Sequence, residues 1–201
     1  MKKLIHSPVR ADEIEDLKIG DIFWLEGTVL TIRDVGHRRV VVDNIELPVR
    51  SEGLAIFHAG PIVKKEDGRL TVVSIGPTTS MRMEKYEYEF IRRTKVKIVI
   101  GKGGMGKETQ KACAEFKAIH CIYPGGCGAL CAKQVVEIAD VKWTDLGMPE
   151  ALYVLKVKDF GPLVVSIDTQ GRNLMEERKK VYISRKEEIL GNLLTEVKSF
   201  R

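Results

Sequence analysis

Apolar and polar positions alternate along the chain in short runs that predict strands and helices in turn. Runs rich in β-branched and aromatic residues predict strands at 22–31, 54–58, 70–74, 96–100, 118–123, 141–144, 151–157 and 163–167. Apolar residues at helical spacing predict helices at 34–42, 79–93, 107–117 and 128–138. The alternation of strand and helix between residues 70 and 140 predicts an α/β domain with a largely parallel sheet. The strand-rich ends, 22–74 and 141–168, indicate a second sheet packed on it.

The last part of the chain has a different composition. From about Met175 the sequence is charged and only weakly periodic in its apolar residues. We therefore expect one domain over residues 1–174 and a charged helical tail over 175–201. The tail is expected to wrap on the core or on a partner.

The segment Ser74–Lys85 predicts a turn that leads from a strand into a helix. Gly76-Pro77 ends the strand, and the hydroxyls that follow can cap the amides at the start of the helix. Arg82 lies about one turn into that helix. Free amides, hydroxyls and a guanidinium then meet in one small volume, which suits a carboxylate or a phosphate. The alternative is a well-capped helix with a surface arginine.

Three cations share a position relative to the predicted strands. Arg33, Arg82 and Lys102 each lie at the carboxyl end of a strand or one turn beyond it, as does Thr78. In open α/β sheets ligands bind at this edge. Together with the hydroxyls of Thr78 and Thr79, three cations suit a dicarboxylate.

Gly101–Lys107 offers an alternative of another class, a phosphate-binding loop. The segment matches the spacing Gly-x4-Gly-Lys between a strand and a helix, but Glu108 stands where Mg²⁺ binding needs Ser or Thr. A carboxylate there would repel the phosphates, so nucleotide hydrolysis is the weaker hypothesis. The glycine amides and Lys102 are still expected to form an anion site.

The cysteines do not predict a metal site on this chain. Their spacings leave seven, five and three residues between them, unlike the pairs of a zinc ribbon. Two of them lie among alanines in predicted helices, which is typical of small core residues. The four are Cys113, Cys121, Cys127 and Cys131.

Composition excludes several classes of function. The 201 residues are 44% hydrophobic, and 33 basic against 28 acidic residues give a net charge of +5. The charges are interleaved and aromatic residues are few, so no nucleic-acid surface is predicted. No apolar run is long enough to span a membrane, and the amino-terminal residues do not form a signal peptide. We expect a cytoplasmic protein.

Several short motifs, taken in order and spacing, resemble one family. They are Arg33-Asp34-x-x-His37, Ala59-Gly-Pro61, Gly76-Pro-Thr-Thr-x-x-Arg-Met83, Ile100-Gly-Lys-Gly103, Tyr123-x-Gly-Gly126 and Asp145-Leu-Gly-x-x-Glu-Ala151. The family is the β subunit, or C-terminal domain, of iron–sulfur-dependent hydro-lyases, which includes class I fumarate hydratase and L-tartrate dehydratase. The resemblance covers about residues 10–174, and its most specific part is the motif at 76–83.

The resemblance implies a three-layer β/β/α swivelling domain and the reversible hydration of fumarate to L-malate, with L-tartrate as the alternative substrate. It implies a [4Fe–4S] cluster that acts as a Lewis acid and is bound by a partner α subunit, none being bound by this chain. The resemblance therefore implies a hetero-oligomer with that α subunit, and a homodimer is the alternative for the isolated chain.

The resemblance also implies roles for individual residues. Substrate carboxylates would be held by Arg33, Thr79, Arg82 and Lys102. Thr78 would transfer the proton, with Thr79 and His37 left open as alternatives. Asp34 and His37 would orient Arg33. A threonine hydroxyl is a poor base, so Thr78 needs cationic neighbours that stabilise its alkoxide.

Overall fold

The central sheet is built mainly of parallel strands. The computed structural model describes residues 3–199, and over this range the sheet has seven strands in the order β1-β2-β3-β6-β7-β9-β8. Their bounds are β1 Leu4–Ser7, β2 Ile22–Thr31, β3 Ala55–Phe57, β6 Ile98–Gly101, β7 Ile119–Ile122, β8 Val135–Lys142 and β9 Leu152–Ile167. The neighbours from β1 to β7 pair in parallel. The predicted α/β class with a largely parallel sheet is therefore confirmed.

The long strand β9 closes this sheet on itself. It runs antiparallel to β7, to β8 and to β2, and at Val164 it pairs with both Ile22 and Ile122. The two strands predicted at 151–157 and 163–167 are thus one strand. Residues 158–162 separate the two predicted strands, yet Phe160 within that interval is fully buried and pairs with Leu25 of β2. Packing of this residue carries the strand through an interval that looks like a turn.

Alternate residues of each parallel strand face two different apolar cores. In β3, Ala55 and Phe57 belong to the core enclosed by the closed sheet, whereas Ile56 belongs to the core beneath the helices. In β6, Ile100 and Val99 divide in the same way. Strands buried on both faces read as continuous apolar runs, which is how the sequence shows them. Two strand layers and one helix layer result.

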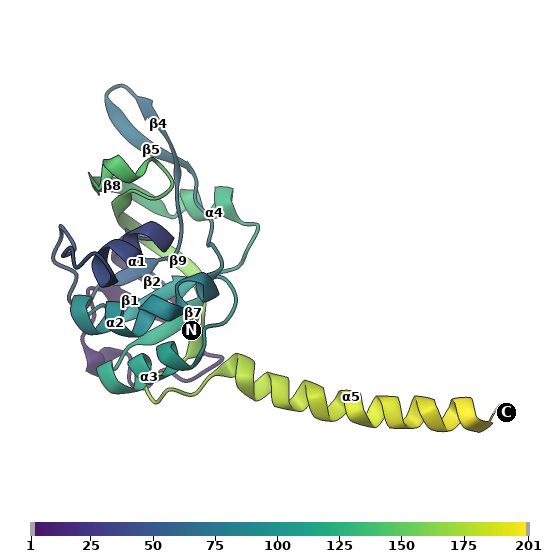
Figure 1. Ribbon diagram of the computed structural model, residues 1–201. Helices are drawn as coiled ribbons and strands as arrows, with labels where there is room; N and C mark the ends of the chain where they lie inside the picture. The colour runs from purple at the N-terminus through teal and green to yellow at the C-terminus, as the bar shows by residue number, and fades with distance from the viewer. Residues whose placement is uncertain (1–2, 200–201) are drawn as a thin grey trace.

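Three helices cover one face of the sheet, as Figure 1 shows: α1 Asp34–Val41, α2 Glu84–Thr94 and α3 Lys107–Phe116. A short 3₁₀ turn, η2 (Ser80–Arg82), precedes α2, so the helix predicted from residue 79 is divided in two. Asp34 is the first residue of α1 and not its cap, which is Arg33.

The prediction for residues 128–138 is wrong in its second half. Helix α4 covers only Gly128–Lys133, and β8 begins at Val135. Val135 and Ile138 are partly buried against the core, while Glu137 between them is exposed. This spacing fits the face of a twisted, bulged strand, and pairing with β9 decides in its favour.

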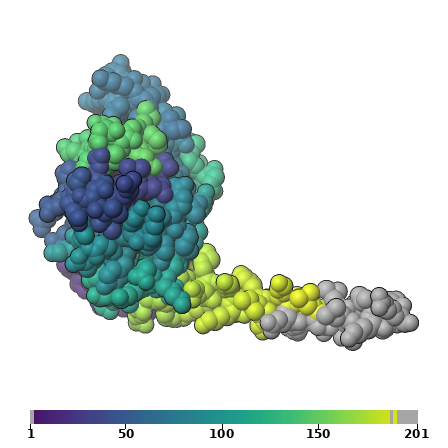
Figure 2. All heavy atoms as spheres, viewed as in Figure 1, coloured from purple at the N-terminus to yellow at the C-terminus, as the bar shows by residue number. Residues whose placement is uncertain are grey.

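A hairpin stands outside the central sheet. Strand β4 (Ile62–Glu66), which the pattern did not predict, pairs with β5 (Arg69–Ser74) in a separate two-stranded sheet. It projects from the body at the top of Figures 1 and 2. The strand predicted at 70–74 therefore exists but does not contribute to the parallel layer.

Helix α5 (Leu174–Ser199) extends away from the body, where the charged tail was expected. It does not wrap on the core of its own chain. Within residues 3–199, no helix combines the length and the apolar character needed to cross a bilayer.

Candidate active site at the carboxyl ends of the parallel strands

The motif at 76–83 places its hydroxyls between two strand ends. The amide of Thr78 donates to the carbonyl of His58, just beyond β3, at 2.6 Å. On the other side, the amide of Lys102 donates to the carbonyl of Thr78 and the amide of Ser80 to that of Lys102, both at 3.0 Å. The segment Pro77–Ser80 is therefore inserted between the ends of β3 and β6.

Arg82 joins two of the residues that the sequence singles out. Its Nη2 atom donates to the hydroxyl of Thr78 at 3.0 Å and to Oδ2 of Asp34 at 2.7 Å. Thr78 and Asp34 are half-buried, while Arg82 is exposed. A guanidinium thus lies directly against the hydroxyl expected to transfer a proton, which favours the charged form of that hydroxyl.

Arg33 reaches the same edge from the end of β2. Its Nε atom lies 3.3 Å from Oε1 of Glu150, and its Nη1 donates to the carbonyl of Pro149 at 3.3 Å. The other oxygen of Glu150 accepts the amide of Val35, in the first turn of α1, at 3.1 Å. Glu150 therefore fixes both the guanidinium and the start of the helix, a role that was not predicted.

The contacts that Asp34 and His37 make differ from those expected around Arg33. Asp34 pairs with Arg82 and does not orient Arg33. His37 contacts Arg33 only through the main chain, because its Nδ1 atom lies 2.9 Å from the carbonyl oxygen of Arg33. The guanidinium of Arg33 is instead held by the loop that contains Glu150.

The remaining predicted residues complete the edge. Thr79 and Lys102 are exposed, and they pair in a parallel bridge between the inserted segment and the end of β6. Gly101, the last residue of β6, lies under Ser80: a Cβ atom at this position would stand 1.8 Å from the Ser80 hydroxyl. The side chain of Ser80 occupies the space that a Cβ atom would need, which explains the glycine. All seven predicted residues lie around this one edge.

Two residues of the layer beneath the site, Glu87 and His58, were not predicted to take part in it. Glu87 is fully buried and faces the rings of His37 and His58, which are fully buried too. Met83 and Phe90, also fully buried, stand four residues before and three after Glu87, so the helical period does place Glu87 on the inner face. A carboxylate at an inner position was the available signal.

The phosphate-binding hypothesis for residues 101–107 is contradicted by the position of Glu84. Its carboxylate accepts the amides of Gly106 at 2.8 Å, Glu108 at 2.9 Å and Thr109 at 3.3 Å. It also accepts the hydroxyl of Thr109 at 2.6 Å. A carboxylate of the chain itself therefore occupies the start of α3, where a phosphate would bind. The amides at the start of α3 are therefore not available to an external anion.

Removing this internal anion should cost stability and yield no nucleotide site. We expect Glu84→Ala to lower the free energy of unfolding by roughly 1–2 kcal/mol, as loss of a charged helix cap does. Urea unfolding measures this change, with Glu108→Ala in the same turn as the matched control, expected within a few tenths of a kcal/mol. ATP with Mg²⁺ should leave the wild-type melting temperature unchanged; a clear rise would restore the nucleotide hypothesis.

The cysteines of this chain do not fit an iron–sulfur cluster. Cys113, Cys121 and Cys131 are buried, and burial raises the pKa of each thiol above its ordinary value, to about 12 for Cys131. Cluster ligands must be thiolates gathered around one point. Among the side chains that the structure describes, the group close enough together to hold an ion contains no cysteine.

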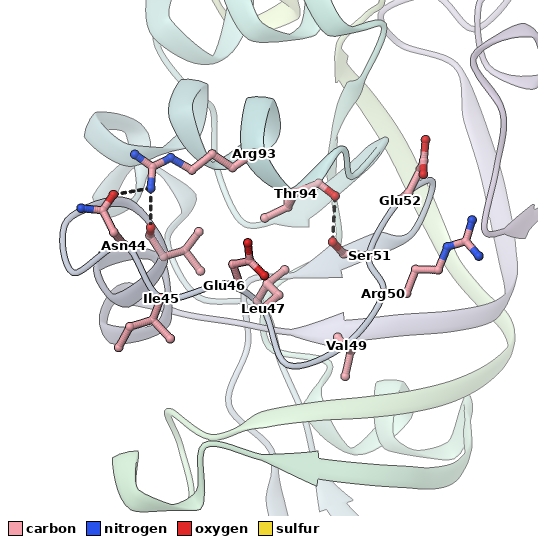
Figure 3. A pocket seen from close by; sticks show the side chains of 11 residues that line it. Asn44, Ile45, Glu46, Leu47, Val49, Arg50, Ser51, Glu52, Arg93 and Thr94 are labelled. Carbon is pink, nitrogen blue, oxygen red and sulfur yellow. Dashed lines mark hydrogen bonds between the residues drawn. The ribbon is translucent and has the colours of Figure 1, made fainter.

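A hollow of about 620 Å³ lies at the other end of helices α1 and α2 (Figure 3). The loop between α1 and β3 forms its wall, tied to α2 by Arg93, which donates to Asn44 at 2.7 Å. Arg50 and Arg93 are accompanied there by Glu46 and Glu52. The charges are mixed, and none of the seven predicted residues lines this hollow. We therefore place the site at the strand ends.

Comparison with known proteins gives a consistent result. A family model described as the fumarase C-terminus matches residues 3–178. The chain is 51% identical over 197 residues to the L(+)-tartrate dehydratase subunit beta of Escherichia coli (strain K12), covering 98% of both chains. It is 43% identical over 175 residues to a putative L(+)-tartrate dehydratase subunit beta of Methanocaldococcus jannaschii, covering 85% of this chain and 90% of the relative.

A more distant relative is a putative fumarate hydratase class I of Geobacillus stearothermophilus. The two are 34% identical over 177 residues, which are 88% of this chain and 34% of the relative. The resemblance drawn from the motifs is thus confirmed, and the chain belongs to the fumarase C-terminus family.

Proposed function

We propose that this chain is the β subunit of a two-chain hydro-lyase that adds water to, or removes it from, a four-carbon dicarboxylate. One observation carries the proposal: the insertion of Pro77–Ser80 brings Thr78 and Arg82 together at the edge where Arg33 and Lys102 also lie. The identity with tartrate dehydratase β subunits over nearly the whole chain supports it.

The proposed division of work follows from chemistry at this edge. Arg33, Arg82, Lys102 and the hydroxyl of Thr79 hold the two carboxylates of the substrate. Thr78 transfers the proton at the carbon beside a carboxylate, and Arg82 stabilises the alkoxide that this transfer requires. Asp34 fixes Arg82 from the opposite side at 2.7 Å. His37 acts on Arg33 through the main chain.

The site on this chain is only half of the catalytic centre in this proposal. Thr79, Arg82 and Lys102 are exposed, so the edge is open to a second surface. Since the cysteines here do not fit a cluster, we assign the [4Fe–4S] cluster to an α subunit that covers this edge. The names of the relatives as β subunits support such a partner. We expect assembly in the cytoplasm.

L-Tartrate is the substrate that the similarity favours. Identity is 51% to a tartrate dehydratase β subunit and 34% to a putative fumarate hydratase. Fumarate, the first expectation from the motifs, remains the second candidate. Both substrates present two carboxylates to the same cations.

Anaerobic co-expression with the candidate α chain tests the proposal. We expect the purified pair to dehydrate L-tartrate, with kcat/KM at least tenfold above that for the fumarate–malate pair. The β chain alone should be inactive. A reversed preference would make the enzyme a fumarate hydratase, and no turnover of either substrate by a pair with an intact cluster would refute the proposal.

A further inference from the structure

Three ionisable side chains meet beneath the candidate site in a cluster that we call the buried triad: His37, His58 and Glu87. None of the three has exposed surface. The Oε2 atom of Glu87 lies 3.4 Å from Nε2 of His37 and 3.5 Å from Nε2 of His58. They come from α1, from the residue after β3 and from α2, so the buried triad connects the elements around the site.

The buried triad is one contact away from both substrate-binding segments. Nδ1 of His37 lies 2.9 Å from the carbonyl of Arg33. Nδ1 of His58 lies 3.1 Å from the hydroxyl of Ser80, and the carbonyl of His58 accepts the amide of Thr78. Any shift of the two rings is therefore transmitted to Arg33 and to the inserted segment.

The partners of His37 determine where its protons lie. A carbonyl oxygen only accepts, so Nδ1 of His37 carries a proton. If the ring were neutral, its bare Nε2 would face a carboxylate, lone pair against lone pair. One proton between Nε2 of His37 and Oε2 of Glu87 removes this conflict and limits the cost of burying a charge. His37 and Glu87 then share this proton across the 3.4 Å contact.

His58 keeps a single proton. Burial, and after it the charges of His37, His120 and Arg82, hold the pKa of His58 well below its ordinary value. Oε2 of Glu87 accepts from this ring, so the proton of His58 lies on Nε2 and the hydroxyl of Ser80 donates to Nδ1. One carboxyl group thus faces Nε2 of both rings and sets the tautomer of His58.

We propose that the buried triad is a proton-sharing cluster that fixes Arg33 and the segment Pro77–Ser80, which makes Glu87 a positioning residue for the reaction. This inference rests on the proposed function. A metal ion is the competing occupant, because two ring nitrogens and a carboxylate are suitable ligands. The three groups supply three ligands and no fourth, and the protons described above already occupy both contacts of Oε2 with the rings.

Kinetics of the reconstituted pair test the positioning role. We expect Glu87→Gln to raise KM for the dicarboxylate and to lower kcat/KM by roughly 10²-fold, the scale of a 1 Å displacement of binding groups. Glu87→Asp keeps the charge and should restore part of the loss. Glu89→Gln, on the same helix but paired with Arg92 and Arg93, is the matched control and should stay within twofold.

A purely structural role gives a different result. It would lower the amount of folded enzyme and hence kcat, leave KM unchanged and show no advantage of Asp over Gln. That outcome overturns the inference, as does wild-type kinetics in Glu87→Gln. If instead the wild-type pair, with its cluster intact, converts neither substrate, the proposed function itself has failed.

Ring-nitrogen NMR of the wild-type chain tests the protons without any activity. We expect a proton on Nδ1 of His37, a proton on Nε2 of His58, and one proton shared between Nε2 of His37 and Glu87. A proton on Nδ1 of His58, or none on Nδ1 of His37, would overturn the inference. So would one equivalent of zinc that stays with the chain through chelation, measured by elemental analysis, because the metal would then replace the protons.

Discussion

Replacing Arg82 by alanine should abolish turnover of the dicarboxylate in the reconstituted pair while leaving the β chain folded. Arg82 is exposed, so its removal leaves no cavity. The substitution does remove the proposed contact with a substrate carboxylate and the cation beside Thr78. Thr78→Ala should lower kcat by roughly 10²–10⁴-fold, the usual loss of a general acid or base. Steady-state kinetics with L-tartrate and with fumarate measures both effects.

Two further variants sharpen this result. Arg82→Lys should also be severely impaired, because one ammonium cannot make the two-pronged contact of a guanidinium. Arg92→Ala removes an equally exposed arginine of the neighbouring helix, whose partner is Glu89, and should leave kcat unchanged. Near-normal kcat in both Thr78→Ala and Arg82→Ala would show that the site lies elsewhere.

Substituting Gly101 by alanine should damage both stability and activity. The added Cβ would stand 1.8 Å from the hydroxyl of Ser80 and 3.2 Å from Nδ1 of His58. Relief requires the inserted segment to move or Ser80 to rotate away from His58. We expect a loss of roughly 1–3 kcal/mol in the free energy of unfolding, as for other overpacked sites, measured by urea unfolding.

A double-mutant cycle identifies the cause. Ser80→Ala removes the oxygen that clashes, so Gly101→Ala should cost less in that background by about 1 kcal/mol or more. Gly103→Ala is the control for glycine substitution in the same loop, since a Cβ there has no atom within 4 Å, although its φ of 78° adds strain. If Gly101→Ala lowers the free energy of unfolding equally in the wild-type and the Ser80→Ala backgrounds, the close packing of Gly101 against Ser80 is contradicted.

Local pattern sufficed for elements whose apolar run is nearly continuous. Strand β2 was predicted with its observed bounds, because eight of the ten residues that follow Gly20-Asp21 are apolar, aromatic or β-branched. Pattern failed where a distant partner decides. Gly161-Pro162 reads as a turn and Val135–Ile138 as helix, yet pairing with β2 and β9 makes both parts of strands.

The candidate site shows the same division. Arg33, Thr78, Arg82 and Lys102 were predicted to share one edge from their positions after strands, and they do lie near one another. The reason given for Thr78 was wrong, because β5 lies outside the central sheet and the turn is inserted between β3 and β6.

The helical period places Glu87 on the inner face of α2, but the partners that explain it could not be assigned from that helix alone. A carboxylate is tolerated at a buried position only with compensating partners, and those partners are far away in the sequence. His37 and His58 come from other elements, and no local pattern connects them to Glu87. Likewise, the position of Glu84 over the start of α3 depends on how α2 and α3 pack.

The closure of the sheet by β9 has a consequence for the order of synthesis on the ribosome. All seven predicted site residues have been made by Lys102, but Leu30 pairs with Val154 and Ile122 with Val164. Until β9 emerges, the nascent chain presents β2 and β7 as open edges, which are prone to pair with other chains. The segments proposed to bind substrate are therefore translated well before the strand that completes their scaffold.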